Sequence, residues 1–264
     1  MILQRRLKAG HNRAKRRLRT SLRWWRRRSP PAQPKGQTLA NPRVLLLCCG
    51  LMALGGAEAQ RNVSELTLVY DYSARPIGDS LRARAGGAER DSVQNAIHTV
   101  YIKGNKSRSE MTSAFFSSTT LFDGNTGFGV IMREVNGQKL LIRMNPDNWT
   151  ERNRMYDGIV YKNTGETREI AGYKCFKAVG QTRFGAVITV YYTRDIIPEN
   201  RQYDPVFRNL DGLPLEYELT NAHLRIRYRI ARINLNPVPV SKFDVPTAGY
   251  REMSYEESQK MNLN

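Results

Sequence analysis

The stretch that decides the fold is Leu224-Arg225-Ile226-Arg227-Tyr228-Arg229-Ile230, near the end of the chain. Apolar and basic residues alternate along it, so one side of an extended strand is apolar and the other carries three guanidinium groups. Such a two-sided strand is typical of an antiparallel sheet that packs one face on a core. Ile233 falls out of phase with this alternation, which predicts a β-bulge at about Ala231.

The same period of two recurs upstream, between short clusters of turn residues. Asp123-Gly124-Asn125 and Asn136-Gly137 are the strongest of these turn signals. Helical patterns are sparse, because Gly86-Gly87 interrupts the one candidate segment, Ser80–Ala96, and only Ser254–Met261 is expected as a short terminal helix. The strands expected from the alternation lie at residues 66–73, 100–103, 116–122, 128–132, 140–144, 173–179 and 184–193.

These patterns predict a mainly β protein, built as a sandwich, a closed barrel, or a curved antiparallel sheet wrapped on a helix or tail. A transmembrane barrel is disfavoured because Ala186–Thr193 is apolar on both faces, which suits a buried central strand. The sequence has no internal repeat with the period of roughly 20–50 residues that a propeller or solenoid requires.

The 264 residues carry 42 Lys and Arg against 24 Asp and Glu, a net charge of +18, and 40% of them are hydrophobic. This composition can fill a core, and it excludes a wholly disordered chain and a coiled coil. The charge is concentrated at the start, since 14 basic residues and one acid, Glu58, lie in residues 1–60. A basic arm can bind nucleic acid through the phosphates, but the segment that follows favours export instead.

That segment is an apolar run of 14 residues, Val44–Ala57, which follows Arg43 and leads into Ala57-Glu58-Ala59. A charged region, an apolar region and an A-x-A site are the parts of a secretory signal peptide. The run is shorter than the roughly 20 apolar residues of a membrane-spanning helix. We therefore expect a leader and signal peptide over residues 1–59 and cleavage after Ala59. A single β domain over residues 60–264 is then expected in the periplasm or outside the cell, neither integral to the membrane nor bound to nucleic acid.

Residues 60–264 contain few of the side chains from which catalytic and metal sites are built. Their histidines are His98 and His223, and Cys175 is their one cysteine, so no intramolecular disulfide is expected. No serine-nucleophile, zinc-protease or Walker motif is present. The sequence predicts no catalytic, metal-binding or cofactor-binding residue and hence a non-enzymatic protein. The two histidines are expected to be structural, and Cys175 to be a buried strand cysteine.

Three further features have both a functional and a structural interpretation. Glu216 and Glu218 share one side of a strand, as an acid–base pair would, but a solvated strand face explains them as well. The arginines at 225, 227 and 229 can bind anionic head groups, or they form a polar outer face opposite those acids. Trp149 follows Asp147-Asn148 in a loop-like stretch, where it contributes to binding or closes the sheet edge.

Three motifs resemble those of the GLPGLI-type envelope proteins of unknown function and related exported families: Ile170-Ala171-Gly172-Tyr173-Lys174-Cys175, Gly212-Leu213-Pro214 and the tail Phe243–Tyr250. The resemblance covers about residues 95–252. Leu215-Glu216-Tyr217 stands where those proteins have Gly-Leu-Ile, so the chain looks like a cousin of the family. Such families are similar in architecture to LolA/LolB-like lipoprotein carriers. This resemblance implies an open half-barrel curled around a helix or plug, with an apolar concave face for acyl chains, in a Gram-negative envelope.

Two hypotheses for the function follow. The first is a periplasmic binding module that holds a lipid or another apolar molecule on the concave face. The second is a structural or interaction module whose exposed sheet edges pair with an envelope protein. An apolar cavity would favour the first, and a filled core with a long exposed edge would favour the second. The candidate lining residues of the concave face, which an ordinary filled core would equally use, are Ile188, Val190, Tyr192, Leu224, Ile226 and Tyr228.

Overall fold

The computed structural model describes residues 60–77, 96–114, 116–135 and 137–261, which belong to one compact unit. The expected leader, the signal peptide with its cleavage site at Ala59, the turn residue Asn136 and nearly all of the segment 80–96 lie outside these residues. Across the described ranges, no helix has the length and apolar character needed to cross a membrane.

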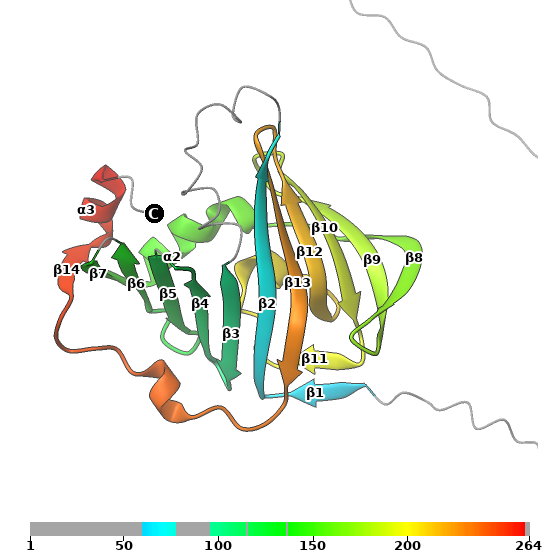
Figure 1. Ribbon diagram of the computed structural model, residues 1–264, viewed down its shortest axis with the longest axis horizontal. Coiled ribbons are helices and arrows are strands. Elements are labelled where there is room, and N and C mark those ends of the chain that lie inside the picture. The colour runs from blue at the N-terminus through cyan, green and yellow to red at the C-terminus, as the bar shows by residue number, and fades with distance from the viewer. Residues whose placement is uncertain (1–59, 78–95, 115, 136, 262–264) are drawn as a thin grey trace, which may run out of the picture. The chain divides into compact units, whose positions relative to one another are not determined.

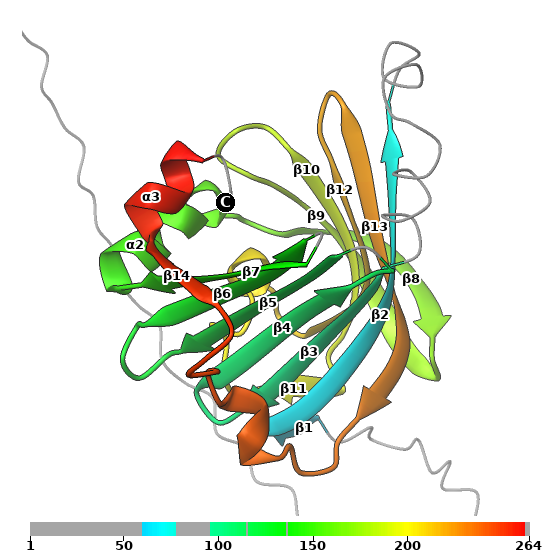
Figure 2. The same ribbon diagram turned by 60° about the vertical axis from the view of Figure 1, so that its left-hand side comes forward.

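Twelve strands form one curved sheet that does not close on itself (Figures 1 and 2). Their order is β14-β7-β6-β5-β4-β3-β2-β13-β12-β10-β9-β8, and every pairing is antiparallel except that of β14 with β7. This confirms the prediction of a mainly β protein with an open, curved sheet. The strands are β2 (Glu65–Pro76), β3 (Ile97–Lys103), β4 (Lys106–Thr112), β5 (Phe116–Asp123), β6 (Gly129–Val135), β7 (Gln138–Met144), β8 (Lys162–Ile170), β9 (Tyr173–Gln181), β10 (Val187–Thr193), β12 (Leu213–Thr220), β13 (Leu224–Asn234) and β14 (Arg251–Ser254).

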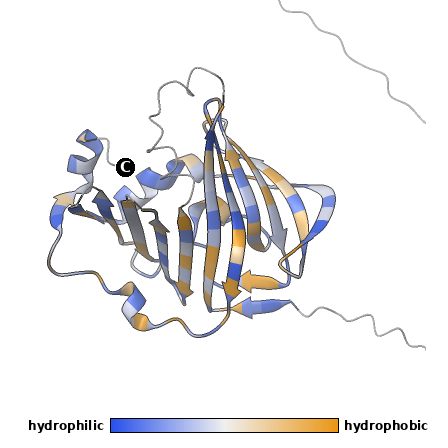
Figure 3. Cartoon of the chain, in the orientation of Figure 1, coloured by the Kyte–Doolittle hydropathy of each residue, from blue (hydrophilic) through white to orange (hydrophobic). Residues whose placement is uncertain are grey.

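Two antiparallel meanders meet at the centre of the sheet, where β2 pairs with β13. One meander runs from β2 to β7, and the other returns from β8 to β13. Polar and apolar residues alternate along β13 (Figure 3), as its sequence predicts. The register of β13 on β2 shifts between Ile230 and Arg232, which confirms the bulge expected at Ala231.

The hairpin between β8 and β9 explains one of the motifs in the sequence. Ala171 and Gly172 have φ values of 52° and 81°, and Ala171 is the one described residue other than glycine with a positive φ. Two consecutive residues with positive φ are typical of a type I′ turn, whose twist matches that of the strands it joins. The tight turn brings Ile170 opposite Tyr173 and sets the register of β8 on β9.

The segment between β10 and β12, residues 194–212, fills one half of the curved sheet, and we call it the plug. It contains β11 (Ile196–Pro198), which pairs in parallel with β1 (Arg61–Val63), and the 3₁₀ helix η3 (Pro205–Phe207). Phe207 is buried edge-on against the ring of Tyr217, with ring centroids 4.7 Å apart. Plug residues and the concave side of β2, β9, β10 and β12 thus share one hydrophobic core.

The other half of the sheet is covered on both faces. The helix α2 (Pro146–Asn153), followed by the 3₁₀ helix η2 (Arg154–Tyr156), lies on the concave face, where Trp149 stacks on Phe122 with centroids 4.2 Å apart. The C-terminal tail packs Phe243, Val245 and Tyr250 on the outer face of β5–β7. The tail contains η4 (Val240–Phe243) and ends in α3 (Tyr255–Lys260), and Figure 2 shows it crossing this face. The predicted fold has a helix or an extended tail packed on the sheet, and the structure contains both.

Two local predictions are wrong. Trp149 lies on a helix and not in a loop, because Asn145 caps the N-terminus of α2, Pro146 begins it and Asn148 completes a capping box. Glu216 does not lie on a solvated strand face, because three arginines cover it and only 6% of the residue is exposed. Its carboxylate forms ion pairs with Arg168, Arg227 and Arg229 at 2.8, 2.5 and 3.2 Å.

Candidate functional site

The register of the strands aligns the concave face into rows of directly opposed residues. One row begins and ends in the two hydrophobic cores but is polar in its middle. Leu68 and Val100 belong to the core around the plug, and Ile131 and Ile142 to the core under α2. The half-buried hydroxyl residues Ser109 and Thr120 lie between them. The concave face therefore carries a polar strip between two packed cores.

The neighbouring row on the same face crosses this strip from an aromatic end to a basic end. It runs through Tyr70, His98, Met111, Ser118 and Arg133, on β2, β3, β4, β5 and β6 in turn. Met111, Ser118 and Arg133 are only half buried, and none of the three belongs to a hydrophobic core. We call these five residues the central row.

Aromatic rings gather at the β2 end of the central row. Tyr228 stacks on Tyr217 with centroids 4.4 Å apart and meets the rings of Tyr72 and His98 edge-on at 5.1 and 5.2 Å. Tyr70 stacks on His98 at 5.8 Å. Tyr72 and Tyr228 are half buried, and Tyr228 packs against the filled core, so this cluster forms the aromatic border of that core.

His98 is neutral at physiological pH, because burial lowers its pKa to about 4. Its Nε2 lies 2.8 Å from the Ser109 hydroxyl, whereas its Nδ1 has no hydrogen-bond partner within the described part of the chain. The residue is 7% exposed. A buried ring nitrogen without a partner is uncommon, and it marks this position as one where a polar group of a ligand or a water can be bound.

The plug contributes a second polar group to the aromatic end. The backbone N–H of Val206 donates to Asp204 Oδ1 over 2.9 Å. Burial raises the pKa of the Asp204 carboxyl to about 6. Burial also raises the pKa values of Tyr70, Tyr156 and Tyr228, and the charge of Asp204 raises them further. The hydroxyl of the adjacent Tyr203 is buried and lacks a hydrogen-bond partner among the described residues.

The raised pKa of Asp204 predicts a pH-dependent stability. The folded protein holds the proton more tightly than the unfolded chain, so this stabilisation is full below pH 4 and is lost as the pH rises through 6. The shift from 3.8 to about 6 corresponds to roughly 2–3 kcal/mol. D204N keeps the acceptor for Val206 and is expected to be more stable than wild type by about that amount at pH 8, with the difference vanishing toward pH 4.

Urea unfolding at pH 4, 6 and 8 measures this difference. D211N is the control, because Asp211 is an exposed carboxylate whose side chain is 68% accessible, and it should differ from wild type by less than about 0.5 kcal/mol throughout. A constant difference between D204N and wild type across the pH range would contradict a carboxyl that protonates near pH 6.

The six predicted lining residues fall into two groups. Ile188, Val190 and Tyr192 on β10 are buried in the core that the plug completes. Leu224, Ile226 and Tyr228 on β13 share that face of the sheet but are only half buried, and Tyr228 packs against the same core from its edge. The β10 side is therefore a filled core, and the β13 side borders the central row.

Several residues of this site are absent from the sequence-based candidates. Met111, Ser118 and Arg133 come together only through the register of three hairpins, which the sequence does not specify. One local signal existed: Arg133 falls on the same side of its strand as Gly129 and Ile131, so a basic side chain interrupts an apolar face. His98 was expected to be structural, and its unpartnered nitrogen becomes apparent only in the fold.

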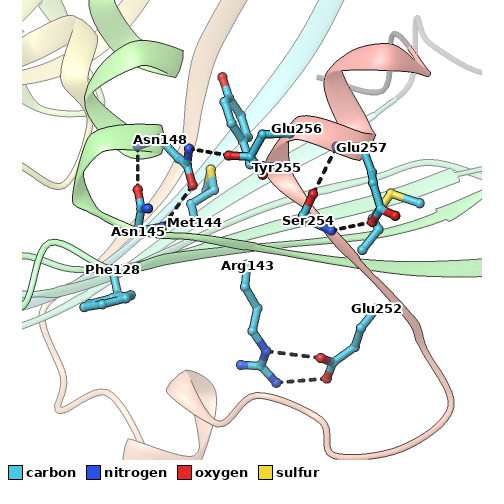
Figure 4. Close-up of a pocket in the computed structure, with 11 residues that line it drawn as sticks. Phe128, Arg143, Met144, Asn145, Asn148, Glu252, Ser254, Tyr255, Glu256 and Glu257 are labelled. Atoms are coloured by element: carbon cyan, nitrogen blue, oxygen red, sulfur yellow. Dashed lines mark hydrogen bonds and ion pairs between the residues drawn. The ribbon is translucent and has the colours of Figure 1, made fainter.

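A separate open pocket of about 610 Å³ lies between the starts of α2 and α3, next to β7 and β14 (Figure 4). Polar side chains that line this pocket form ion pairs and hydrogen bonds with one another. Arg143 binds Glu252 at 3.0 Å, and the Asn148 amide donates to Glu256 over 3.1 Å. These contacts join the C-terminal tail to β7 and α2, which is a structural role.

No protein-family profile and no curated protein matches this chain. Among solved structures, it is similar to PNGF-II, with 14% identity and a TM-score of 0.46 over 75% of this chain and 33% of that one. It is also similar to the Mycobacterium tuberculosis lipoprotein LppX (10% identity, TM-score 0.35, 66% and 88% covered) and to MucB (14%, 0.31, 72% and 60%). The chain spans about a third of the length of PNGF-II. Similarities this distant do not extend to ligands or partners, and the resemblance to the GLPGLI-type proteins stays a prediction.

Proposed function

We propose that this protein is an exported, non-enzymatic binding module of the bacterial envelope that holds a lipid or other apolar small molecule on its concave face. The observation that carries the proposal is the pair of half-buried residues Met111 and Ser118 on the concave face, which the central row joins through His98 to the half-buried ring of Tyr228. A half-buried apolar side chain such as Met111, which lies outside the packed cores and beside a few polar groups, is typical of the lining of a ligand site. The neutral imidazole of His98 suits the same role.

A pair of variants on adjacent residues of β5 tests this site. Ser118 lies on the concave face and its neighbour Ser117 on the opposite face, since side chains alternate along a strand. S118W places an indole in the strip and is expected to weaken binding of the fluorescent probe N-phenyl-1-naphthylamine at least tenfold. S117W carries the same added bulk and should keep the wild-type affinity. Equal binding by both variants would place the probe outside the strip.

The alternative is an interaction module that pairs through a sheet edge, and β8 supplies its specific support. Its nine residues form one edge of the sheet and most of them are exposed. One feature of β8 counts against this alternative. The register of β8 on β9 is irregular between Asn163 and Thr167, with Gly165 at a φ of 81°, and such irregularities protect an edge strand from pairing with another chain. Partner binding through β8 would be unaffected by S118W, which separates the two functions.

A further inference from the structure

We propose that Arg133 and Arg152 form a subsite for the anionic head group of an amphipathic ligand, a carboxylate or a phosphate, whose apolar part lies along the central row toward Tyr228. This inference rests on the proposed function and specifies the ligand class of the same site. The ligand would be a single-chain anionic amphiphile.

The first observation is the position of Arg133 in the central row. It follows Ile131 on the concave side of β6 and lies opposite Ser118 on β5. Three strand-to-strand steps separate it from His98, or about 14 Å at the usual spacing of 4.7–4.9 Å. The row is therefore long enough to hold an alkyl chain between the aromatic cluster and the guanidinium.

The second observation is the side of α2 on which Arg152 lies. Trp149 packs directly over β6, because a Cβ built on Gly129 would come within 2.7 Å of the indole Cε3. Arg152 is three residues later and so shares the sheet-facing side of the helix. Arg154 is exposed and pairs with Glu151 at 3.3 Å, whereas Arg152 is half buried and forms no ion pair with a carboxylate of the described residues.

The two guanidinium groups are close enough to affect each other. Burial lowers the pKa of Arg133 and the nearby charge of Arg152 lowers it further, while burial also lowers the pKa of Arg152. Two like charges that are partly removed from water in one place favour a bound anion, which both guanidinium groups can contact through charge-assisted hydrogen bonds.

The charges along the row set the direction of the ligand. The Asp204 carboxyl lies near the aromatic end, where its negative charge acts on Tyr228 and Tyr156, and the positive charge of Arg152 also acts on Tyr156. An anionic head is repelled by the first group and attracted by the second. The apolar part therefore lies against Tyr228 and Met111, and the head lies between the arginines.

Calorimetric titration of the protein, expressed from its full sequence, tests the subsite with three ten-carbon probes. Decanoate and decyl phosphate carry the two candidate anionic heads, and monodecanoylglycerol is an uncharged ligand with the same chain. Wild type is expected to bind at least one anionic probe about tenfold or more tightly than the uncharged one, as charge-assisted hydrogen bonds imply. The tighter of the two anions identifies the head.

R133Q and R152Q should each lower the affinity for the anionic probe about tenfold while changing that for monodecanoylglycerol less than threefold. R152K, which retains the charge, should recover part of the loss and serves as the second variant if R133Q does not fold. R154Q removes an exposed arginine from the same region and should bind like wild type. Equal affinity of all three probes for wild type, with R152Q unaffected, would overturn the subsite and leave the proposed function intact. Failure of wild type to bind any probe would overturn both.

Discussion

G212A is expected to destabilise the protein by about 3–5 kcal/mol, since backbone strain and overpacking act together at this position. Gly212 immediately precedes β12 with a φ of 154°, and a Cβ there would lie 2.1 Å from the Thr193 carbonyl oxygen. That oxygen belongs to the backbone of β10, so no side-chain rotation relieves the clash. The next residues are also constrained, because Leu213 is buried and the Tyr70 hydroxyl donates to the Pro214 carbonyl over 2.8 Å. The close approach of β12 to β10 and the burial of Leu213 therefore explain the Gly-Leu-Pro motif.

Urea unfolding followed by circular dichroism measures this loss. G104A is the matched control, because Gly104 also has a positive φ, 53°, but a Cβ there meets no atom within 4 Å. Its cost should be limited to the backbone strain of about 1–2 kcal/mol. If G212A were as stable as G104A, the close approach of β12 to β10 would be wrong.

F207A is expected to destabilise the protein by a similar amount, about 3–5 kcal/mol, because it removes a buried aromatic ring from the plug. Phe207 is 3% exposed and packs edge-on against Tyr217. The lost ring leaves a cavity between the plug and the sheet, beneath the cluster that contains Tyr228. The same unfolding measurement applies.

F184A makes the identical substitution at a residue that is 70% exposed in the turn between β9 and β10. Its stability should lie within about 0.5 kcal/mol of wild type. A small effect of F207A, equal to that of F184A, would show that the plug does not fill the curved sheet in solution.

The strands could be predicted because each one carries its own alternation and its own turn residues. The arginine-rich stretch of β13 gives the strand, its two faces and the bulge at Ala231, all of which depend on neighbours in sequence. The helix α2 was missed because PDNWTERN has no apolar periodicity, and only Asn145 and Pro146 signal its start. The burial of Glu216 was missed because Arg168, on β8, comes from a strand far away in sequence.

The candidate site could be predicted only in part, for the same reason. Tyr228 and Ile226 were found from the apolar face of one strand, but that face continues into a filled core at Val190 and into a polar strip at Met111. The difference depends on what covers each stretch, namely the plug in one half and α2 in the other. Their packing is a tertiary property that strand periodicity does not encode.

Native mass spectrometry of the protein purified from the producing cells, compared with its denatured mass, tests most directly whether the concave face holds a small molecule. We expect a stoichiometric adduct that is lost on denaturation, extracts into organic solvent as a single-chain anionic amphiphile, and is absent from S118W but present in S117W. A native mass equal to the polypeptide alone, together with no uptake of added decanoate, decyl phosphate or monodecanoylglycerol, would contradict it and favour the sheet edge at β8 as the functional surface.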